Sequence, residues 1–345
     1  MFDKLIGNED IKEILRQMIV KGRVPRSLLF AGQEGIGKRR FALETAKSFV
    51  CHATRAGEAC DRCAACRRAD KFEFPKTDDR EAHKKLVFSE YPDIGQIVPY
   101  GKNILVDAVR DLEREANFRP YEAQARFFII DDADRMNDAA SNALLKTLEE
   151  PAATTYLFLV TSRPDSLLQT IRSRCQTIRF APVAGREIES LLLTTKKFAP
   201  DDAALVARLA AGSIGRALDF DLERFRARRE LMLKVLRAAV ARGDRLTLLK
   251  AGEEINDAKN KDDYELYLEI LQTLIRDLWS ISLGAEESLT INVDLRPALG
   301  ALAERAEKGK LVSWMNEIET LRERLAVNVN RKIAADALFM EMARA

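Results

Sequence analysis

The stretch Gly32-Gln33-Glu34-Gly35-Ile36-Gly37-Lys38 lies between a short apolar run and a helical pattern, and it decides the fold of the first half of the chain. In a loop of this shape, glycines let backbone N–H groups face a phosphate, and the lysine reaches toward it. The N-terminus of the helix that follows adds a positive end. A strand, this loop and a helix in that order predict an α/β domain with a phosphate-binding loop.

The residue after this loop departs from the pattern. Ser or Thr normally follows the lysine and coordinates Mg²⁺, but here the position is Arg39. A guanidinium cannot be a metal ligand, and at about 4 Å it would repel a unit positive charge by ~4 kcal/mol, and a divalent ion by twice as much. Two interpretations of Gly32, Gly35, Gly37 and Lys38 stay open: residual binding of ATP or phosphate, or a loop kept only for packing.

An acidic pair, Asp131 and Asp132, follows the apolar run at residues 127–130. Asp131 is expected to face a magnesium ion. Asp132 stands where a longer Glu usually activates water, and catalysis is sensitive to shifts of about 1 Å. The alternative is a solvated acidic turn after a core strand. The pair therefore predicts a nucleotide site that is poorly equipped for hydrolysis.

The character of the chain changes near residue 182. Before it, apolar runs typical of buried strands alternate with helical patterns. The expected strands are 26–31, 125–130, 156–161 and 176–180, and the expected helices are 39–51, 105–117 and 138–150. After it the spacing is helical, as at 187–194, 201–211, 215–240, 264–280 and 311–325. The fold class is thus α/β plus all-α, with a second boundary near residue 225.

The composition excludes several classes of protein. The chain has 345 residues, 47% of them hydrophobic, which predicts two or three globular domains. With 56 Lys+Arg against 54 Asp+Glu, the net charge of +2 gives no strong attraction to nucleic acid or membrane. No secretory signal pattern and no apolar run of about 18 residues occurs, so we expect a cytoplasmic protein without a membrane partner.

Four of the five cysteines, Cys51, Cys60, Cys63 and Cys66, fall within sixteen residues. Four thiolates suit tetrahedral zinc at about 2.3 Å and leave no open position for catalysis. An iron–sulfur cluster and disulfides are the alternatives. The spacing therefore predicts a structural zinc module.

Several motifs together resemble the clamp-loader branch of the AAA+ ATPases, specifically the subunits of bacterial DNA polymerase III clamp loaders. The most informative is Ser173-Arg174-Cys175, just before the last expected strand. The others are NALLKTLEEP at 142–151, TSRP at 161–164, NVNRK at 328–332 and the cysteine spacing. The resemblance covers nearly the whole chain. It implies an AAA+ domain with a zinc module over 1–182 (the module at 51–66), a helical lid over 183–224 and a helical collar for oligomerisation over 225–345.

The resemblance also implies roles for two residues. Arg174 would point out of its subunit at the γ-phosphate bound by a neighbour, as an arginine finger commonly worth about 10³–10⁵ in rate. An ordinary surface arginine in a salt bridge is the alternative. Thr161 falls where the family senses the γ-phosphate. The implied partners are the motor subunits and the clamp-opening subunit, with the sliding clamp and primer–template DNA reached through the complex.

Two departures indicate which kind of subunit this is. One is Arg39, and the other is Gly215, where motor subunits carry an arginine that contacts their own nucleotide. Arg216 projects about 100° away around a helix and cannot substitute. The pattern is that of a delta-prime-type stator, without autonomous ATPase activity but part of a nucleotidyltransferase complex that replicates DNA. An active motor subunit is the first alternative, and a zinc-containing nucleic-acid binder is a weaker one.

Overall fold

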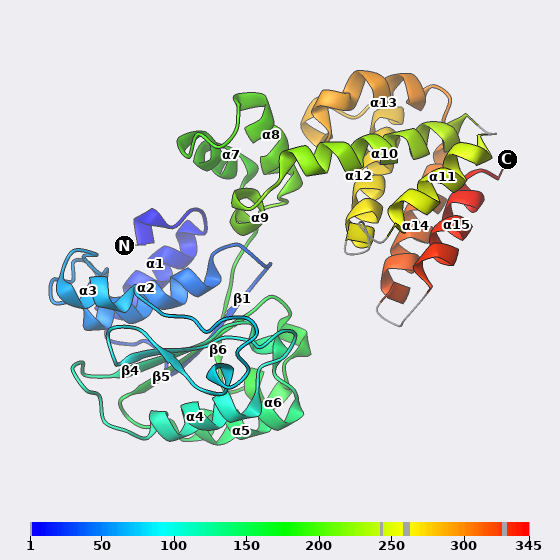
Figure 1. The fold of residues 1–345 in the computed structure, drawn as a ribbon. Helices are drawn as coiled ribbons and strands as arrows, with labels where there is room; N and C mark the ends of the chain where they lie inside the picture. Colours follow the sequence, from blue (N-terminus) through cyan, green and yellow to red (C-terminus); the bar gives the residue numbers. More distant parts are fainter. Residues whose placement is uncertain (1, 242–243, 258–262, 326–329, 345) are drawn as a thin grey trace. The chain divides into compact units, whose positions relative to one another are not determined.

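The computed structural model describes residues 2–241, 244–257, 263–325 and 330–344 (Figure 1). The chain divides into two compact units. The first comprises Met1–Thr195 with Ala210–Leu218, and the second comprises Lys196–Leu209 with Asp219–Ala345. The helices of the expected lid, residues 183–224, are therefore shared between the two units.

A six-stranded sheet forms the centre of the first unit. Its strands are β1 (Ser27–Ala31), β2 (Val87–Phe88), β3 (Ile94–Ile97), β4 (Arg126–Ile130), β5 (Thr155–Thr161) and β6 (Gln176–Arg179). They lie in the order β2-β3-β4-β5-β1-β6, and all pairs are parallel except β2 with β3. The four predicted strands are confirmed within one residue at each end. β2 and β3 were not predicted from the sequence.

Helices cover both faces of this sheet (Figure 1). One face carries α1 (Glu9–Val20), α2 (Lys38–Val50) and α3 (Ala64–Ala69), and the other carries α4 (Val106–Ala116), α5 (Asp138–Glu149) and α6 (Gln169–Arg172). Alternate residues of one strand serve the two cores: Phe127 packs with the first set of helices and Phe128 with the second. This two-sided burial explains the continuous apolar runs. The unit also contains α7 (Gly185–Thr194), α9 (Ile214–Leu218) and the short helices η1 (Phe2–Lys4), η2 (Ala82–Lys84), η3 (Ala133–Arg135) and η4 (Pro164–Ser166).

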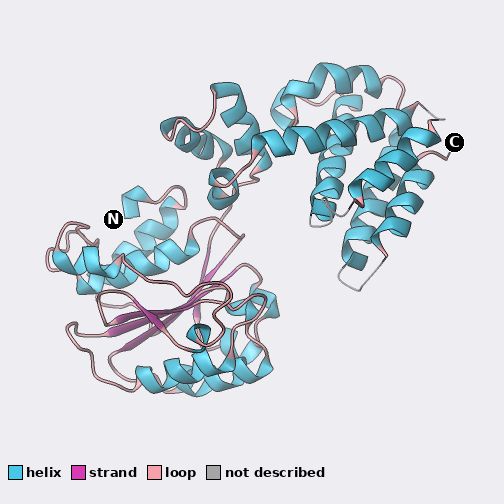
Figure 2. Cartoon of the chain, viewed as in Figure 1, coloured by secondary structure: helices cyan, strands magenta, loops and turns pink. Residues whose placement is uncertain are grey.

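The described residues of the second unit form helices joined by loops, without a strand (Figure 2). Its helices are α8 (Pro200–Leu209), α10 (Leu222–Val240), α11 (Arg245–Ile255), α12 (Tyr264–Ser282), α13 (Arg296–Ala303), α14 (Lys308–Leu325) and α15 (Arg331–Met342), with η6 (Glu287–Leu289) and η7 (Val293–Leu295). α12 packs against α10, α13 and α14, and its inward residues Leu268, Leu271 and Leu274 are buried. The predicted class, an α/β domain with a mostly parallel sheet followed by helices, is confirmed.

The continuous helix expected at 215–240 is wrong. α9 ends at Leu218 and α10 begins at Leu222, because the Asp221 side chain accepts a hydrogen bond from the Arg224 N–H and caps a new helix. Of the motif at 328–332, Asn328 and Val329 lie outside the described residues, while Asn330 caps α15. No helix within the described ranges is both long and apolar enough to cross a membrane.

Candidate functional site

The phosphate-binding loop joins β1 to α2, as the sequence predicts. Gly35 and Gly37 have φ values of +75° and +94°, in the left-handed region that glycine adopts without steric penalty. The Lys38 side chain is buried, and its Nζ donates a hydrogen bond of 2.6 Å to the Gln33 carbonyl of the same loop. Burial lowers the pKa of Lys38, although the nearby carboxylates, Asp131 first, oppose the shift. The lysine is thus folded back onto the loop backbone.

The loop also packs tightly against the start of α9. The Gly215 N–H donates a 2.8 Å hydrogen bond to the Gly35 carbonyl. A Cβ added to Gly35 would lie 2.2 Å from Ser213 Oγ, and one added to Gly215 would lie 3.2 Å from the Gly35 Cα. Gly35 is therefore favoured by its positive φ and by the Ser213 side chain, and a Cβ at Gly215 would fit only if the Gly35 backbone moved by a few tenths of an ångström.

Arg39 forms an ion pair with Asp131, at 3.2 Å between Nη1 and Oδ2. Its guanidinium also lies 5.7 Å from the centre of the Phe74 ring, within the charged segment 71–85. Asp131 is largely buried, which raises its pKa, while Arg39 opposes the shift and Asp132 adds to it. Arg39 therefore supplies the positive charge beside Asp131, the carboxylate that would hold magnesium.

The remaining predicted residues lie at the same edge, because β1, β4 and β5 are parallel neighbours and end together. Thr161 Oγ1 donates a 2.7 Å hydrogen bond to Asp134, which also binds Arg163. Burial works to raise the pKa of Asp134, but these two donors outweigh it and lower the pKa. Asp132 pairs with Arg135 at 3.2 Å. Asp134 had no role assigned from the sequence; only its place in the acidic run could have suggested one.

Arg174 lies at the opposite edge of the sheet. It precedes β6, whose first residue pairs with Leu28 near the start of β1, whereas the phosphate-binding loop follows the end of β1. Its Nη2 donates to Glu149 Oε1 at 2.6 Å, and its Nη1 donates to the Thr170 carbonyl at 2.9 Å. The residue is exposed. The length of the strands therefore separates the Arg174 guanidinium from the phosphate-binding loop of its own chain. The surface salt bridge, which was the alternative interpretation of Arg174, is present as the pair with Glu149.

The four predicted cysteines form one cluster. Their Sγ atoms all lie within 4.8 Å of one another, compared with about 3.8 Å expected around a tetrahedral zinc ion. Backbone N–H groups donate to three of the sulfurs: Cys51 accepts from Cys60 and Ala53, Cys60 from Cys63, and Cys63 from Cys66. Hydrogen bonds from the backbone N–H groups of Arg62 and Cys63 lower the pKa of Cys60 to about 6. Cys66, the most buried of the four, has a raised pKa because of that burial. The cluster fits a thiolate-bound metal ion.

Ion pairs join the cysteine module to α2. Lys47 is fully buried, and its Nζ binds Asp61 and Asp70 at 2.7 Å each and Glu44 at 3.0 Å. Asp61 lies between two of the cysteines, and Asp70 follows α3. The helix that begins at the phosphate-binding loop thus carries the module on its other end.

Two family models match this chain. "DNA polymerase III, delta subunit" covers residues 7–184, and "DNA polymerase III, delta subunit, C terminal" covers residues 223–342. The chain belongs to the DNA polymerase III delta subunit family. Among individual relatives, the delta-prime subunits of Bacillus subtilis and Escherichia coli are each 29% identical, over 93% of this chain and 91% and 90% of their own lengths.

A longer relative, the DNA polymerase III tau subunit of Bacillus subtilis, is 27% identical over 79% of this chain but only 46% of its own length. These two delta-prime relatives are therefore matched over about nine tenths of their length, and the tau relative over less than half of its length. The resemblance to bacterial clamp-loader subunits, stated from the sequence, is confirmed.

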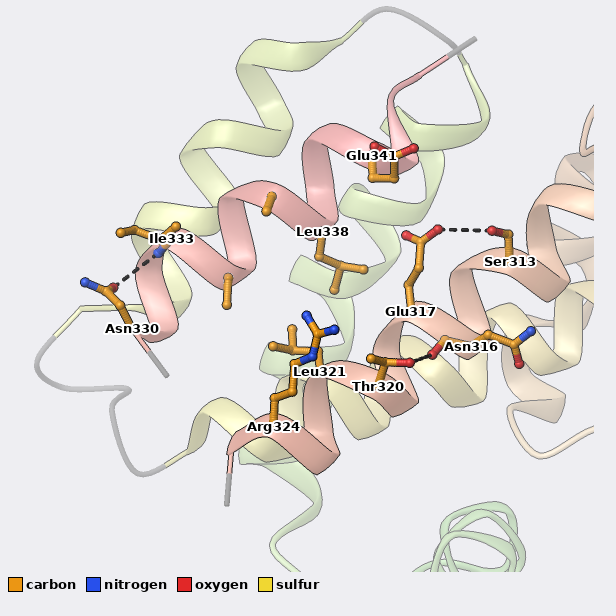
Figure 3. Close-up of a pocket in the computed structure, with 12 residues that line it drawn as sticks. Ser313, Asn316, Glu317, Thr320, Leu321, Arg324, Asn330, Ile333, Leu338 and Glu341 are labelled. Carbon is orange, nitrogen blue, oxygen red and sulfur yellow. Dashed lines mark hydrogen bonds between the residues drawn. The ribbon is translucent and has the colours of Figure 1, made fainter. Parts of the chain in front are cut away.

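In this member of the DNA polymerase III delta family, a separate pocket of about 740 Å³ lies in the second unit (Figure 3). It is formed by α14 and α15, and Thr320, Leu321 and Leu338 are among the residues that line it. No residue predicted to bind nucleotide or metal takes part in it.

Proposed function

We propose that this chain is the non-motor, delta-prime-type subunit of a DNA polymerase III clamp loader. In the assembled ring it supplies Arg174 to the ATP site of a neighbouring motor subunit while the sliding clamp is loaded during replication. The observation that carries the proposal is the position of Arg174 at the sheet edge remote from its own phosphate-binding loop. A guanidinium there can assist phosphoryl transfer only on a nucleotide held by another chain.

The chain's own phosphate-binding loop also supports a non-motor role. Arg39 rather than a hydroxyl group follows Lys38, and it is paired with Asp131. Gly215 replaces the sensing arginine. A site of this kind can contact a phosphate only through its backbone and Lys38, and it has no place for magnesium. The alternative of an ATP-hydrolysing motor subunit requires a magnesium site, which this arrangement does not favour.

The proposed partners follow from the relatives. They are the motor subunits and the clamp-opening subunit, contacted through the AAA+ domain and the helical collar at 225–345, with clamp and primer–template DNA reached through the complex in the cytoplasm. The metal proposed for the four cysteines is zinc, in a structural role, because four thiolates fill a tetrahedral shell and leave no open position.

Removal of the Arg174 guanidinium tests the proposal. The loader is reconstituted with only the motor site that faces this chain left active, the other sites being silenced at their phosphate-loop lysines. We expect Arg174→Ala to lower ATP hydrolysis at that site by about 10³-fold, with ATP still bound. Arg172→Ala serves as the control. It removes a guanidinium that lies two positions before Arg174 in the sequence and is paired with Asp165. Equal activity of Arg174→Ala and wild type would refute the in-trans role.

A further inference from the structure

The guanidinium of Arg174 is held at two points by its own chain. One is the carboxylate of Glu149, the last residue of α5, and the other is the Thr170 carbonyl in α6. α5 packs against α6. Both anchors therefore belong to helices of the layer that covers one face of the sheet, and neither belongs to a loose loop.

These two contacts leave most of the guanidinium available. Arginine has five N–H groups in a planar fork, and the bonds to Glu149 and Thr170 use one from each terminal nitrogen. A phosphate can still be approached by the remaining N–H groups. An unanchored arginine would have to lose its rotamer freedom when the phosphate arrives, whereas an anchored one has lost it already.

We infer that Glu149 is a positioning residue for Arg174: its carboxylate orients the guanidinium before the neighbour's ATP site forms around it. This inference rests on the proposed in-trans role of Arg174. The exposed Glu149–Arg174 pair contributes little to folding, as is usual for ion pairs near the surface. Its contribution is instead to the geometry of the arginine, so its loss should be detected in the rate of hydrolysis.

The chain offers a matched control for this carboxylate. Glu150 is the next residue, is also exposed, and is the C-cap of the same helix, but it makes no ion pair with Arg174 among the contacts of the described residues. A general effect of negative charge at the end of α5 would be shared by both glutamates. An effect that acts through Arg174 belongs to Glu149 alone.

The experiment uses the reconstituted loader in which only the adjoining motor site is active. We expect Glu149→Ala to lower kcat for ATP about tenfold with KM unchanged, and Glu149→Gln, which keeps one oxygen acceptor, to lower it less. Glu150→Ala should match wild type. The double variant Glu149→Ala/Arg174→Ala should be no slower than Arg174→Ala alone, because a residue that acts through the arginine has nothing to add once it is gone.

Each result decides the inference. A wild-type or faster rate for Glu149→Ala would overturn it, the faster rate showing that the carboxylate restrains the arginine. Additive loss in the double variant, or a drop of the unfolding temperature of Glu149→Ala by more than a few degrees, would indicate a structural role instead. If Arg174→Ala itself has no effect, the proposed function fails, and this outcome is separate from a failure of Glu149 alone.

Discussion

Asp131 is a carboxylate whose ion pair with Arg39 does not offset the cost of its burial. Its pKa is raised by burial in spite of the guanidinium at 3.2 Å. The ionised form of a group with a raised folded-state pKa is less favourable in the folded chain than in the unfolded chain. The associated loss of stability is absent below the unfolded value of about 4, develops as pH rises from that value to the pKa of the folded state, and is complete above it.

Asp131→Asn should therefore stabilise the isolated chain at neutral pH, on the order of 1 kcal/mol, as relief of a strained polar site commonly does. The advantage over wild type should shrink toward zero below about pH 4, where Asp131 is protonated in both states. Denaturant unfolding at several pH values measures it. Asp165→Asn, at a carboxylate that is almost fully exposed, is the control. A destabilised Asp131→Asn at neutral pH would mean that the ion pair outweighs the burial.

The sequence alone was enough to single out Arg39 and Asp131, but it did not show that the two residues form an ion pair. The sequence indicated Arg39 as a lost hydroxyl group and Asp131 as a metal-facing carboxylate, each from its distance to a motif. That the two would bind each other depends on β4 lying near the loop, although 92 positions separate them along the chain. The contact of Thr161 with Asp134 was hidden for the same reason. Glu149 stood within a quoted motif, but only the approach of α5 to α6 gives it a partner.

At the scale of elements, β4 and β5 were predicted from nearly continuous apolar runs, whereas β6, with the sequence QTIR, is mostly exposed. β3, with the sequence IGQI, is fully buried but contains Gly95 and Gln96, so its apolar pattern is too short to distinguish it from a loop. β2 has only two residues. The break between α9 and α10 was missed because the residues on both sides keep helical spacing, and the cap at Asp221 was not recognised as a start.

The cysteine module is an element whose stability should depend on its metal. It contains one short helix, α3, and a few buried residues, and Arg40 and the buried Lys47 link it to α2 through ion pairs. Four clustered thiolates repel one another without a cation, and binding of structural zinc contributes on the order of 10 kcal/mol to ordering such modules. Loss of metal should therefore disorder the module and leave Lys47 with fewer of its partners.

We expect one zinc ion per chain in freshly reduced protein, and removal of zinc by a chelator should lower the unfolding temperature by at least about 10 °C. Cys63→Ser should abolish stoichiometric zinc, whereas Cys175→Ser, at the buried cysteine outside the cluster, should retain it. Metal analysis and thermal unfolding with and without chelator provide the test. A value well below one zinc per chain, or iron in its place, would contradict the assignment.

At the scale of the whole molecule, the first unit departs at three separate points from the pattern that the proposed family role associates with hydrolysis. Arg39 replaces the magnesium-binding hydroxyl group, Asp132 is one carbon shorter than the usual glutamate, and Gly215 replaces the sensing arginine. Reversal of the third requires a small shift of the Gly35 backbone, because a Cβ at Gly215 would lie 3.2 Å from the Gly35 Cα. Restoring the hydroxyl group alone should therefore recover nucleotide binding that depends on Mg²⁺, and not ATP hydrolysis.

Arg39→Thr separates these functions. The hydroxyl group and the released Asp131 together form half of a magnesium site, so nucleotide binding by the isolated variant should become dependent on Mg²⁺. Hydrolysis should stay absent, because Asp132 and Gly215 are unchanged: we expect turnover below about 10⁻² s⁻¹ in both wild type and variant, far under the usual range for enzymes. Arg40→Thr, at a neighbouring guanidinium paired with Glu44 and Asp70, should change neither property. Fluorescent-nucleotide titrations with and without Mg²⁺ and a phosphate-release assay measure the two. Turnover on the order of 1 s⁻¹ by the isolated wild-type chain would identify a motor subunit, since it would show that the chain's own site is complete.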